Sequence, residues 1–147
     1  MSITFNHRNL PSLLLQARES VMAHFAPNLR KEGLTDQQWR VLRVLSEQGT
    51  SDTGTIASSA YLLGPSLSGV LTRMERDGLI SRVQDDLDAR RTLVSATTKG
   101  KRIAQRLLSS IEAHYQFMET AVGKPQLAQL YALLDSVIVL KKCKAKP

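Results

Sequence analysis

The stretch TGTIASSAYLLGPSLSGVLTRMERDGLI, residues 53–80, contains two short segments with helical patterns on either side of a tight turn. The first predicted helix covers about residues 53–61. The second begins near Pro65, because proline is favoured at a first helical position, and Gly78 supplies its stop signal. Two short helices joined by a glycine-containing turn, here at residues 63–64, predict a helix-turn-helix.

The second of these helices begins with small and hydroxylated residues. Such an end can enter the major groove of DNA, about 12 Å wide, and bring the backbone close to base edges and phosphates. We expect Leu67, Leu71 and Met74 to face the core. The predicted DNA-contacting residues of this helix are Pro65, Ser66, Ser68, Gly69, Thr72 and Arg73, and the Arg73 guanidinium suits a phosphate or a guanine edge. The alternative is an ordinary helix capped by its serines, because helix-turn-helix patterns also arise by chance.

Two predicted strands, residues 79–83 and 92–97, flank a charged loop that is too long for a two-residue hairpin turn. A ribbon ending in Arg90 and Arg91 can place a guanidinium in the minor groove, where A·T-rich DNA concentrates negative potential. Asp88 is the expected ion-pair partner of Arg90. An exposed pair contributes only about 0–1 kcal/mol of stability, so we expect Asp88 to orient Arg90. The alternative is a solvated charged loop.

Helical periodicity continues on both sides of this region. A helix is predicted from Leu13 to about Arg30, with a kink caused by Pro27. A second helix begins after Thr35, which should form a capping box with Gln38. Further helices are predicted from residue 97 or 98 onward and over about residues 125–141. The order predicts a mostly α (α+β) fold, a winged helix-turn-helix over residues 35–99 with added helices in 1–34 and 100–147.

Composition narrows the class of partner. The formal net charge is +7 and the pI is about 9.9, which favours an anionic partner such as nucleic acid. Aromatic residues make up only 5% of the chain, which argues against single-strand binders that stack bases on rings. Duplex DNA is therefore the expected partner.

Several other classes are not indicated by the sequence. No long uncharged apolar run or signal peptide is evident, so we expect a cytoplasmic protein without a membrane partner. The only cysteine, Cys143, excludes an internal disulfide. No nucleophile, base and orienting group occur together, and no phosphate loop or metal cluster appears. We therefore expect neither an enzyme nor a bound cofactor or metal.

Three segments, LTDQQWRVLRVL (34–45), PSLSGVLTRMERDGLI (65–80) and DLDARRTLVSATTKG (86–100), resemble the second helix, recognition helix and wing of MarR-family transcription regulators. With LLLQARESVM (13–22) they are most similar to the branch of homoprotocatechuate-degradation regulators. The resemblance implies a homodimer whose terminal helices interlock and whose two winged helices read a pseudopalindromic operator. It also implies that Arg90, in the D-x-R motif with Asp88, is the minor-groove residue. Many members carry an arginine where this chain has Gly69, so base readout is expected to differ here.

Arg18 is the residue that we single out for sensing a ligand. It falls within the apolar stripe of the first predicted helix, where an unpaired charge is costly. An aromatic carboxylate could meet its guanidinium through a bidentate contact, with His24 and Trp39 as further candidate ligand-binding residues. The alternatives are a protein acid as the partner of Arg18, a half-exposed His24 and a core Trp39.

The sequence thus predicts a dimeric repressor that is released from its operator by a small aromatic carboxylate and controls aromatic catabolism. Two alternatives remain. A redox-responsive regulator would act through Cys143, and a non-regulatory architectural protein would bind duplex DNA with little sequence preference. Arg18 on an apolar face argues against the latter.

Overall fold

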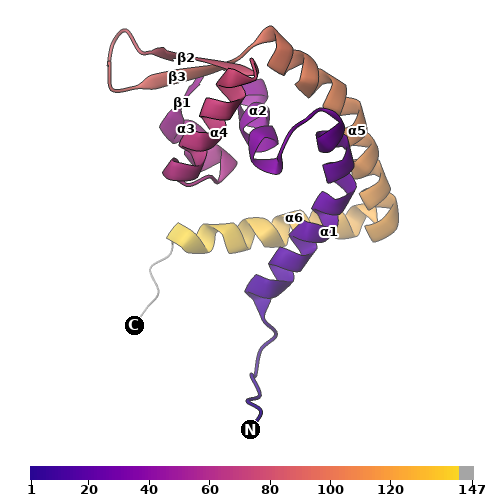
Figure 1. Cartoon of the computed structure of the whole chain (residues 1–147). Helices are drawn as coiled ribbons and strands as arrows, with labels where there is room; N and C mark the ends of the chain where they lie inside the picture. The colour runs from indigo at the N-terminus through magenta and orange to yellow at the C-terminus, as the bar shows by residue number, and fades with distance from the viewer. Residues whose placement is uncertain (143–147) are drawn as a thin grey trace. The chain divides into compact units, whose positions relative to one another are not determined.

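The computed structural model describes residues 1–142, in two compact units, Met1–Ser110 and the segment from Ile111 onward. The predicted helices and strands occur in the expected order, with a short strand β1 and a terminal 3-10 helix in addition (Figure 1). They are α1 (Leu10–Lys31), α2 (Asp36–Gln48), β1 (Ser51–Asp52), α3 (Thr53–Ala60), α4 (Gly64–Arg76), β2 (Ile80–Gln84), β3 (Thr92–Ala96), α5 (Thr98–Val122), α6 (Lys124–Ile138) and the 3-10 helix η1 (Val139–Lys142). The mostly helical winged-helix fold is confirmed.

Helix α2 begins at the predicted capping box. The Thr35 hydroxyl accepts a hydrogen bond from the Gln38 backbone N–H at 3.1 Å, and the Gln38 side chain accepts one from the Thr35 N–H at 3.0 Å. Two N–H groups that the first turn would leave without partners are thereby satisfied. Gly49, with φ +76°, ends the helix. These local signals fix α2 at the centre of the winged helix.

The turn between α3 and α4 differs slightly from the prediction. Helix α3 ends at Ala60 because Tyr61 adopts a left-handed conformation, φ 52°, and Leu62 donates back to the Ala57 carbonyl at 3.0 Å. Gly64 already belongs to α4, and Pro65 lies in the first turn. The predicted turn at residues 63–64 was therefore placed too far along the chain. Glycine is the usual residue at such a helix end, so a tyrosine there is not a recognisable stop signal.

The core lies beneath α4, the second helix of the helix-turn-helix. The predicted core residues Leu67, Leu71 and Met74 are at most 3% exposed. They share the interior with apolar residues of α2, α3 and β3, namely Val41, Leu42, Ile56 and Val94. Burying one such side chain contributes about 1.5–3 kcal/mol, so this cluster holds α4 against the rest of the domain. Its opposite face is left exposed.

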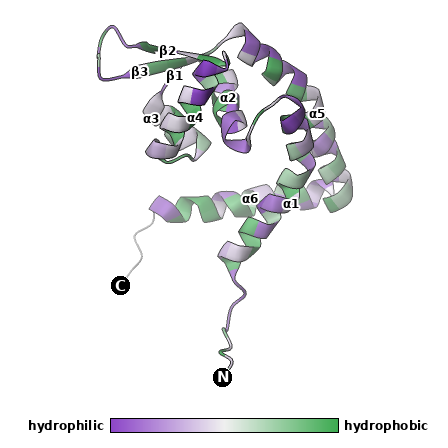
Figure 2. Cartoon of the chain, viewed as in Figure 1, coloured by the Kyte–Doolittle hydropathy of each residue, from purple (hydrophilic) through white to green (hydrophobic). Residues whose placement is uncertain are grey.

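The wing is an antiparallel pair of strands, with Ile80 opposite Ala96 and Gln84 opposite Thr92. The ends differ by one residue from the prediction. A third strand, β1, pairs Ser51 with Val94, so the sheet order is β1-β3-β2. Sequence reasoning missed β1 because two residues are too few to show an alternating pattern. Figure 1 shows β2 and β3 extending as a hairpin, and its loop is mainly hydrophilic in Figure 2.

Thr97 joins the wing to α5. Its hydroxyl donates to the Gly78 carbonyl at 2.6 Å and accepts from the Gly100 N–H at 3.1 Å, while its own N–H donates to the Leu79 carbonyl at 3.0 Å. A Cβ at Gly100 would overlap that Leu79 carbonyl oxygen. The helix predicted to begin at residue 97 or 98 therefore begins at Thr98, with Thr97 acting as its cap.

The outer helices leave much apolar surface exposed in the single chain. Helix α1 begins after Asn9, whose side chain accepts from the Ser12 N–H at 3.1 Å, and continues through Pro27. Figure 2 shows green residues recurring along α1 and α6. The exposed apolar side chains include Leu10, Leu13, Leu15 and Val21 of α1, Leu108, Phe117 and Val122 of α5, and Leu130, Leu133 and Ile138 of α6.

Candidate nucleic-acid interface and effector pocket

The exposed face of α4 carries the residues that the sequence predicted to contact DNA. Five of the six are exposed and Gly69 is half-buried, while the apolar residues of the same helix face the core. The Thr72 hydroxyl donates to the Ser68 carbonyl at 3.0 Å. The exposed set is Pro65, Ser66, Ser68, Thr72 and Arg73. Short side chains at the start of the helix and one arginine farther along give a surface narrow enough for a major groove.

Arg90 extends from the tip of the wing. Its side chain is 93% exposed, and its Nε lies 3.3 Å from the Asp88 carboxylate, which also accepts the Arg90 backbone N–H at 3.0 Å. The ion pair between Asp88 and Arg90 that the sequence predicted is therefore present. One carboxylate oxygen holds both the backbone and the side chain of Arg90, while the other guanidinium donors face solvent.

Arg91 has a different environment from its neighbour. Its guanidinium forms ion pairs with Asp52 at 2.8 Å and with Asp85 at 3.2 Å. Hydrogen bonds from the Thr55 N–H and from Arg91 lower the pKa of Asp52 from 3.8 to about 2. Asp52 is also the N-cap of α3, so Arg91 connects the base of the wing loop to the start of that helix. The sequence grouped Arg91 with the DNA-contacting residues, but its described contacts are those of a structural link.

A second link joins the wing to the recognition helix. Arg82 of β2 donates from its guanidinium and from its backbone N–H to the two carboxylate oxygens of Glu75 on α4, each at 3.1 Å. The hydrogen bond from Arg82 lowers the pKa of Glu75. Sequence reasoning missed this pair, because a contact between a helix and the following strand has no fixed spacing.

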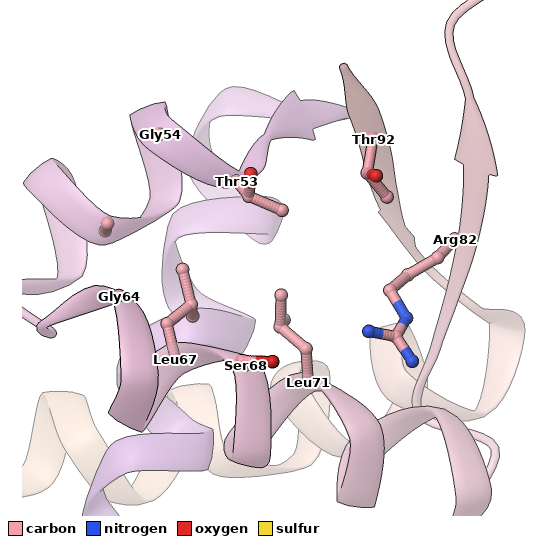
Figure 3. Close-up of a pocket in the computed structure, with 9 residues that line it drawn as sticks. Thr53, Gly54, Gly64, Leu67, Ser68, Leu71, Arg82 and Thr92 are labelled. Atoms are coloured by element: carbon pink, nitrogen blue, oxygen red, sulfur yellow. The ribbon is translucent and has the colours of Figure 1, made fainter. Parts of the chain in front are cut away.

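Arg82 also borders a hollow of about 380 Å³ between α3, α4 and the wing. Figure 3 shows its guanidinium directed toward α4, with Thr53 and Thr92 across the hollow from that helix. Leu67, Ser68 and Leu71 line the helical side. The hollow separates the recognition helix from the wing, the two parts that carry the candidate DNA contacts.

Arg18 has a protein carboxylate as its partner in the single chain. Arg18 is not buried in an apolar stripe in the single chain; its side chain is half exposed and pairs with Asp36 of α2 at 2.6 Å. The part of the stripe around Arg18, with Leu14 and Val21, is exposed, whereas Phe25 is half-buried and Leu29 is buried. The alternative partner, a protein acid, is the one that the structure shows. His24 is exposed and Trp39 half-buried.

Arg18 nevertheless lines a pocket of about 370 Å³ together with two arginines that sequence reasoning did not single out. Arg40 and Arg43 lie on the same face of α2, and Glu47 is also at its edge. The pairs Asp36–Arg40 and Arg43–Glu47 are spaced by four residues, a signal that could have identified this face. His24 and Trp39 are not among the residues that line the pocket.

Arg40 connects this pocket to the helix-turn-helix. Its Nη1 donates to the Ala60 carbonyl at 2.8 Å and to the Tyr61 carbonyl at 3.1 Å. Its buried Nε lies 3.4 Å from Asp36 but makes no hydrogen bond. The same guanidinium therefore contacts the end of α3 and borders the space next to Arg18.

The described part of the chain contains neither a metal-binding cluster nor a helix suited to span a membrane. Residues 1–142 contain no group of three or more His, Cys, Asp or Glu that could hold a metal ion. None of the described helices combines the length and the apolarity needed to span a bilayer. Cys143, on which the redox alternative depends, lies outside the described residues.

Comparison with known proteins identifies the family. The MarR family model matches residues 34–92. The homoprotocatechuate degradative operon repressor of Escherichia coli is 40% identical over 91% of this chain and 90% of its own length. Among solved structures, transcriptional regulator PA4135 is 42% identical, with a TM-score of 0.85 over 95% of this chain and 100% of that one. NadR in complex with 4-hydroxyphenylacetate is 35% identical, with a TM-score of 0.80 over 93% and 97%.

These relatives are regulators of transcription, in agreement with the prediction that the chain is not an enzyme. The family model covers the helix-turn-helix and most of the wing, and the longer alignments extend into the outer helices. The chain belongs to the MarR family of winged helix-turn-helix transcription regulators.

Proposed function

We propose that the protein is a dimeric repressor in the cytoplasm that binds a pseudopalindromic DNA operator and responds to a small aromatic carboxylate. The observation that carries DNA binding is the exposed face of α4 beside Arg90, the 93% exposed arginine of the wing. The helix face suits the major groove, and the arginine suits the adjacent minor groove. The formal charge of +7 favours association with the phosphate backbone.

The test of DNA binding is the affinity of purified protein for duplexes at several salt concentrations. Arg90→Ala should weaken binding to every duplex and lower the salt slope by about 1, because one cationic contact with the DNA is lost. The variant should unfold at the wild-type temperature, since Arg90 is exposed. Arg30→Ala, which removes an exposed arginine from the last turn of α1, serves as the control. Equal affinities of Arg90→Ala and wild type at matched salt would show that the wing does not contact DNA.

The effector proposal rests on the pocket that Arg18, Arg40 and Arg43 line. Three guanidinium groups next to Val44 and Ala60 offer an anion site with an apolar wall. Support comes from NadR, which is 35% identical and binds 4-hydroxyphenylacetate, and from the 40% identical repressor of a homoprotocatechuate operon. We propose the same class of ligand here, with Arg18 as its carboxylate partner and Arg40 and Arg43 beside it; His24 and Trp39, the other two predicted ligand-binding residues, do not line this pocket.

Release from DNA requires that the ligand bind the conformer with lower DNA affinity more tightly. Arg40 offers a route, because a carboxylate that attracts its guanidinium would compete with the Ala60 and Tyr61 carbonyls. The end of α3 would then shift relative to α4. In a dimer this change would move the two recognition helices away from the roughly 34 Å spacing of successive half-sites.

Calorimetric titration with hydroxyphenylacetates, hydroxybenzoates and cinnamates tests the effector proposal. The best of these ligands should bind wild type and Arg30→Ala equally, and Arg18→Ala at least tenfold more weakly, because a charge-assisted contact is lost. If Arg18→Ala binds it as well as wild type does, Arg18 is not the sensor. A change in operator affinity on oxidation that Cys143→Ser abolishes would instead support the redox alternative.

A further inference from the structure

Helix α4 has a glycine in its interior, where glycine is unfavourable. Gly69 lies in the middle of the helix and its φ is not positive. Glycine at such a position costs about 0.5–1 kcal/mol relative to alanine. The backbone conformation of α4 therefore does not require glycine at position 69, so the side chains around this position are the remaining structural reason for it.

The group that lies against Gly69 is the guanidinium of Arg73. A Cβ built on Gly69 would be 3.4 Å from Arg73 Nη1, 3.9 Å from Nη2 and 4.0 Å from Cζ. The planar end of Arg73 thus covers the surface of the preceding turn. Helical side chains lean toward the N-terminus of their helix, so a residue four positions later is the one expected to cover this spot.

The side chain of Arg73 therefore carries its positive charge toward the N-terminal end of α4. In helix-turn-helix proteins the N-terminal residues of the recognition helix contact base edges. Arg73 itself is in the third turn of α4, but its guanidinium lies over Gly69, next to the exposed Ser68 and Thr72. A longer side chain at position 69 would occupy the same space and displace it.

The Arg73 guanidinium also lacks a protein partner among the described residues. Arginines near the same surface pair with acids, namely Arg76 with Asp77, Arg82 with Glu75, Arg90 with Asp88, and Arg91 with Asp52 and Asp85. Within residues 1–142, the Arg73 guanidinium makes no hydrogen bond and no ion pair. Glu75 and Asp77, the nearest acids in sequence, already bind other arginines. All five donors of Arg73 are therefore available to DNA.

We propose that Gly69 and Arg73 act as one unit of sequence readout, in which Arg73 contacts a guanine through its O6 and N7 atoms in the major groove and Gly69 positions it. Bidentate binding to guanine matches the fork of an arginine and discriminates by about 1–3 kcal/mol against other bases. This inference rests on the proposed function, because it names the base contact of the proposed DNA-binding helix.

The experiment begins with selection of the preferred operator from a randomised duplex pool by the wild-type protein. Affinities are then measured for this operator, for operators with each G·C pair replaced, and for a random duplex. Arg73→Ala should bind the operator at least tenfold more weakly, lose the preference at one G·C pair in each half-site, and bind random duplex almost as wild type does. Arg73→Lys should retain the wild-type salt slope but lose the same preference, because lysine lacks the bidentate fork.

Gly69 is tested by substitution in two backgrounds. In the wild-type background Gly69→Leu should abolish the preference at the same G·C pair. In the Arg73→Ala background it should cause little further loss of operator affinity, because it acts by displacing Arg73. Gly69→Ala, whose Cβ is accommodated at 3.4 Å, should retain the preference and controls for changes in helix propensity. Circular dichroism confirms that each variant is folded.

Two results would overturn the inference. Equal losses for operator and random duplex in Arg73→Ala would make Arg73 a phosphate contact. Equal costs of Gly69→Leu in both backgrounds would show that position 69 meets DNA by itself. Failure of the proposed function is distinct, since the wild-type protein would then prefer no duplex over another.

Discussion

Arg90 and Arg91 are adjacent and identical in type, yet the structure gives them different environments. Arg90 faces solvent with one local partner, whereas Arg91 is held by Asp52 and Asp85. The pair between Asp88 and Arg90 could be predicted because the two residues are close in sequence. The contact between Asp52 and Arg91 spans 39 residues and depends on how the wing folds back onto α3.

Arg18 shows another limit of sequence reasoning at this scale. Periodicity correctly placed it on one stripe of a helix, but the pattern does not say what covers that stripe. In the single chain the stripe is exposed around Arg18, and Asp36 of the next helix supplies the counter-charge. Arg40 and Arg43 could not be recognised as pocket residues, because their pairs with Asp36 and Glu47, four residues away, are also typical of an ordinary solvated helix face.

Gly100 is a residue at which a single methyl group should matter. In Gly100→Ala the new Cβ would collide with the Leu79 carbonyl oxygen, a backbone atom that accepts the Thr97 N–H. Relief requires a backbone shift, so we expect a loss of about 1–3 kcal/mol in the free energy of unfolding. Denaturant titration measures it.

Gly54→Ala is the matched control for this substitution. Gly54 also lies in a first helical turn, its φ is not positive, and a Cβ there would meet only the Asp52 side-chain oxygen, at an ordinary contact distance of 3.4 Å. This variant should be as stable as wild type or more stable by about 0.4–1 kcal/mol. Equal effects of the two substitutions would contradict the collision at Gly100.

At the scale of elements, the sequence predicted best where a local signal marks a boundary. The capping box defined the start of α2, and Gly78 followed the end of α4. Two features lacked such a signal. Tyr61 ends α3 in a conformation that usually takes glycine, and β1 exists only because β3 lies beside it.

The stability that Asp52 contributes at the start of α3 should depend on pH. The folded-state pKa of Asp52, about 2, lies below its ordinary value of 3.8. Its contribution to stability is therefore complete above about pH 4 and is lost as the pH falls toward 2. We expect Asp52→Asn to unfold more easily than wild type at pH 6 and to show a smaller loss of stability between pH 4 and 2.

Thermal unfolding of both proteins between pH 6 and 2 measures this difference. Asp86→Asn is the matched control, because Asp86 is an exposed acid of the same wing loop whose side chain makes no hydrogen bond or ion pair within residues 1–142 that protonation would break. Parallel stability curves for wild type and Asp52→Asn would show that the interactions of Asp52 with Thr55 and Arg91 do not stabilise the fold.

At the scale of the whole molecule, the apolar surface of the outer helices indicates a second copy of the chain. A folded monomer rarely exposes so many large apolar residues on its helices. We therefore expect a dimer with twice the chain mass of 16.3 kDa. The assignment of residues 1–34 and 100–147 to dimerisation remains a prediction.

Leu15→Glu tests the dimer. Leu15 of α1 is 58% exposed in the single chain, and a carboxylate there would be buried without a partner in an interface. Sedimentation should show a shift of the variant toward monomer. A binding titration should show a lower affinity for the full operator. Leu87→Glu, at the exposed tip of the wing, should remain dimeric. A dimeric Leu15→Glu would exclude this part of α1 from the interface.

The bonds of Thr97 have a consequence for how such a regulator can evolve. The carbonyls of Gly78 and Leu79 and the N–H of Gly100 are all backbone groups, so the joint between α4 and α5 depends on few side chains. Substitutions on the reading face of α4 or along α5 leave these bonds in place. Exposed residues of α4 and α5 can therefore be replaced one at a time in related sequences while the joint keeps the same backbone partners, with the Thr97 hydroxyl as the side-chain group that it requires.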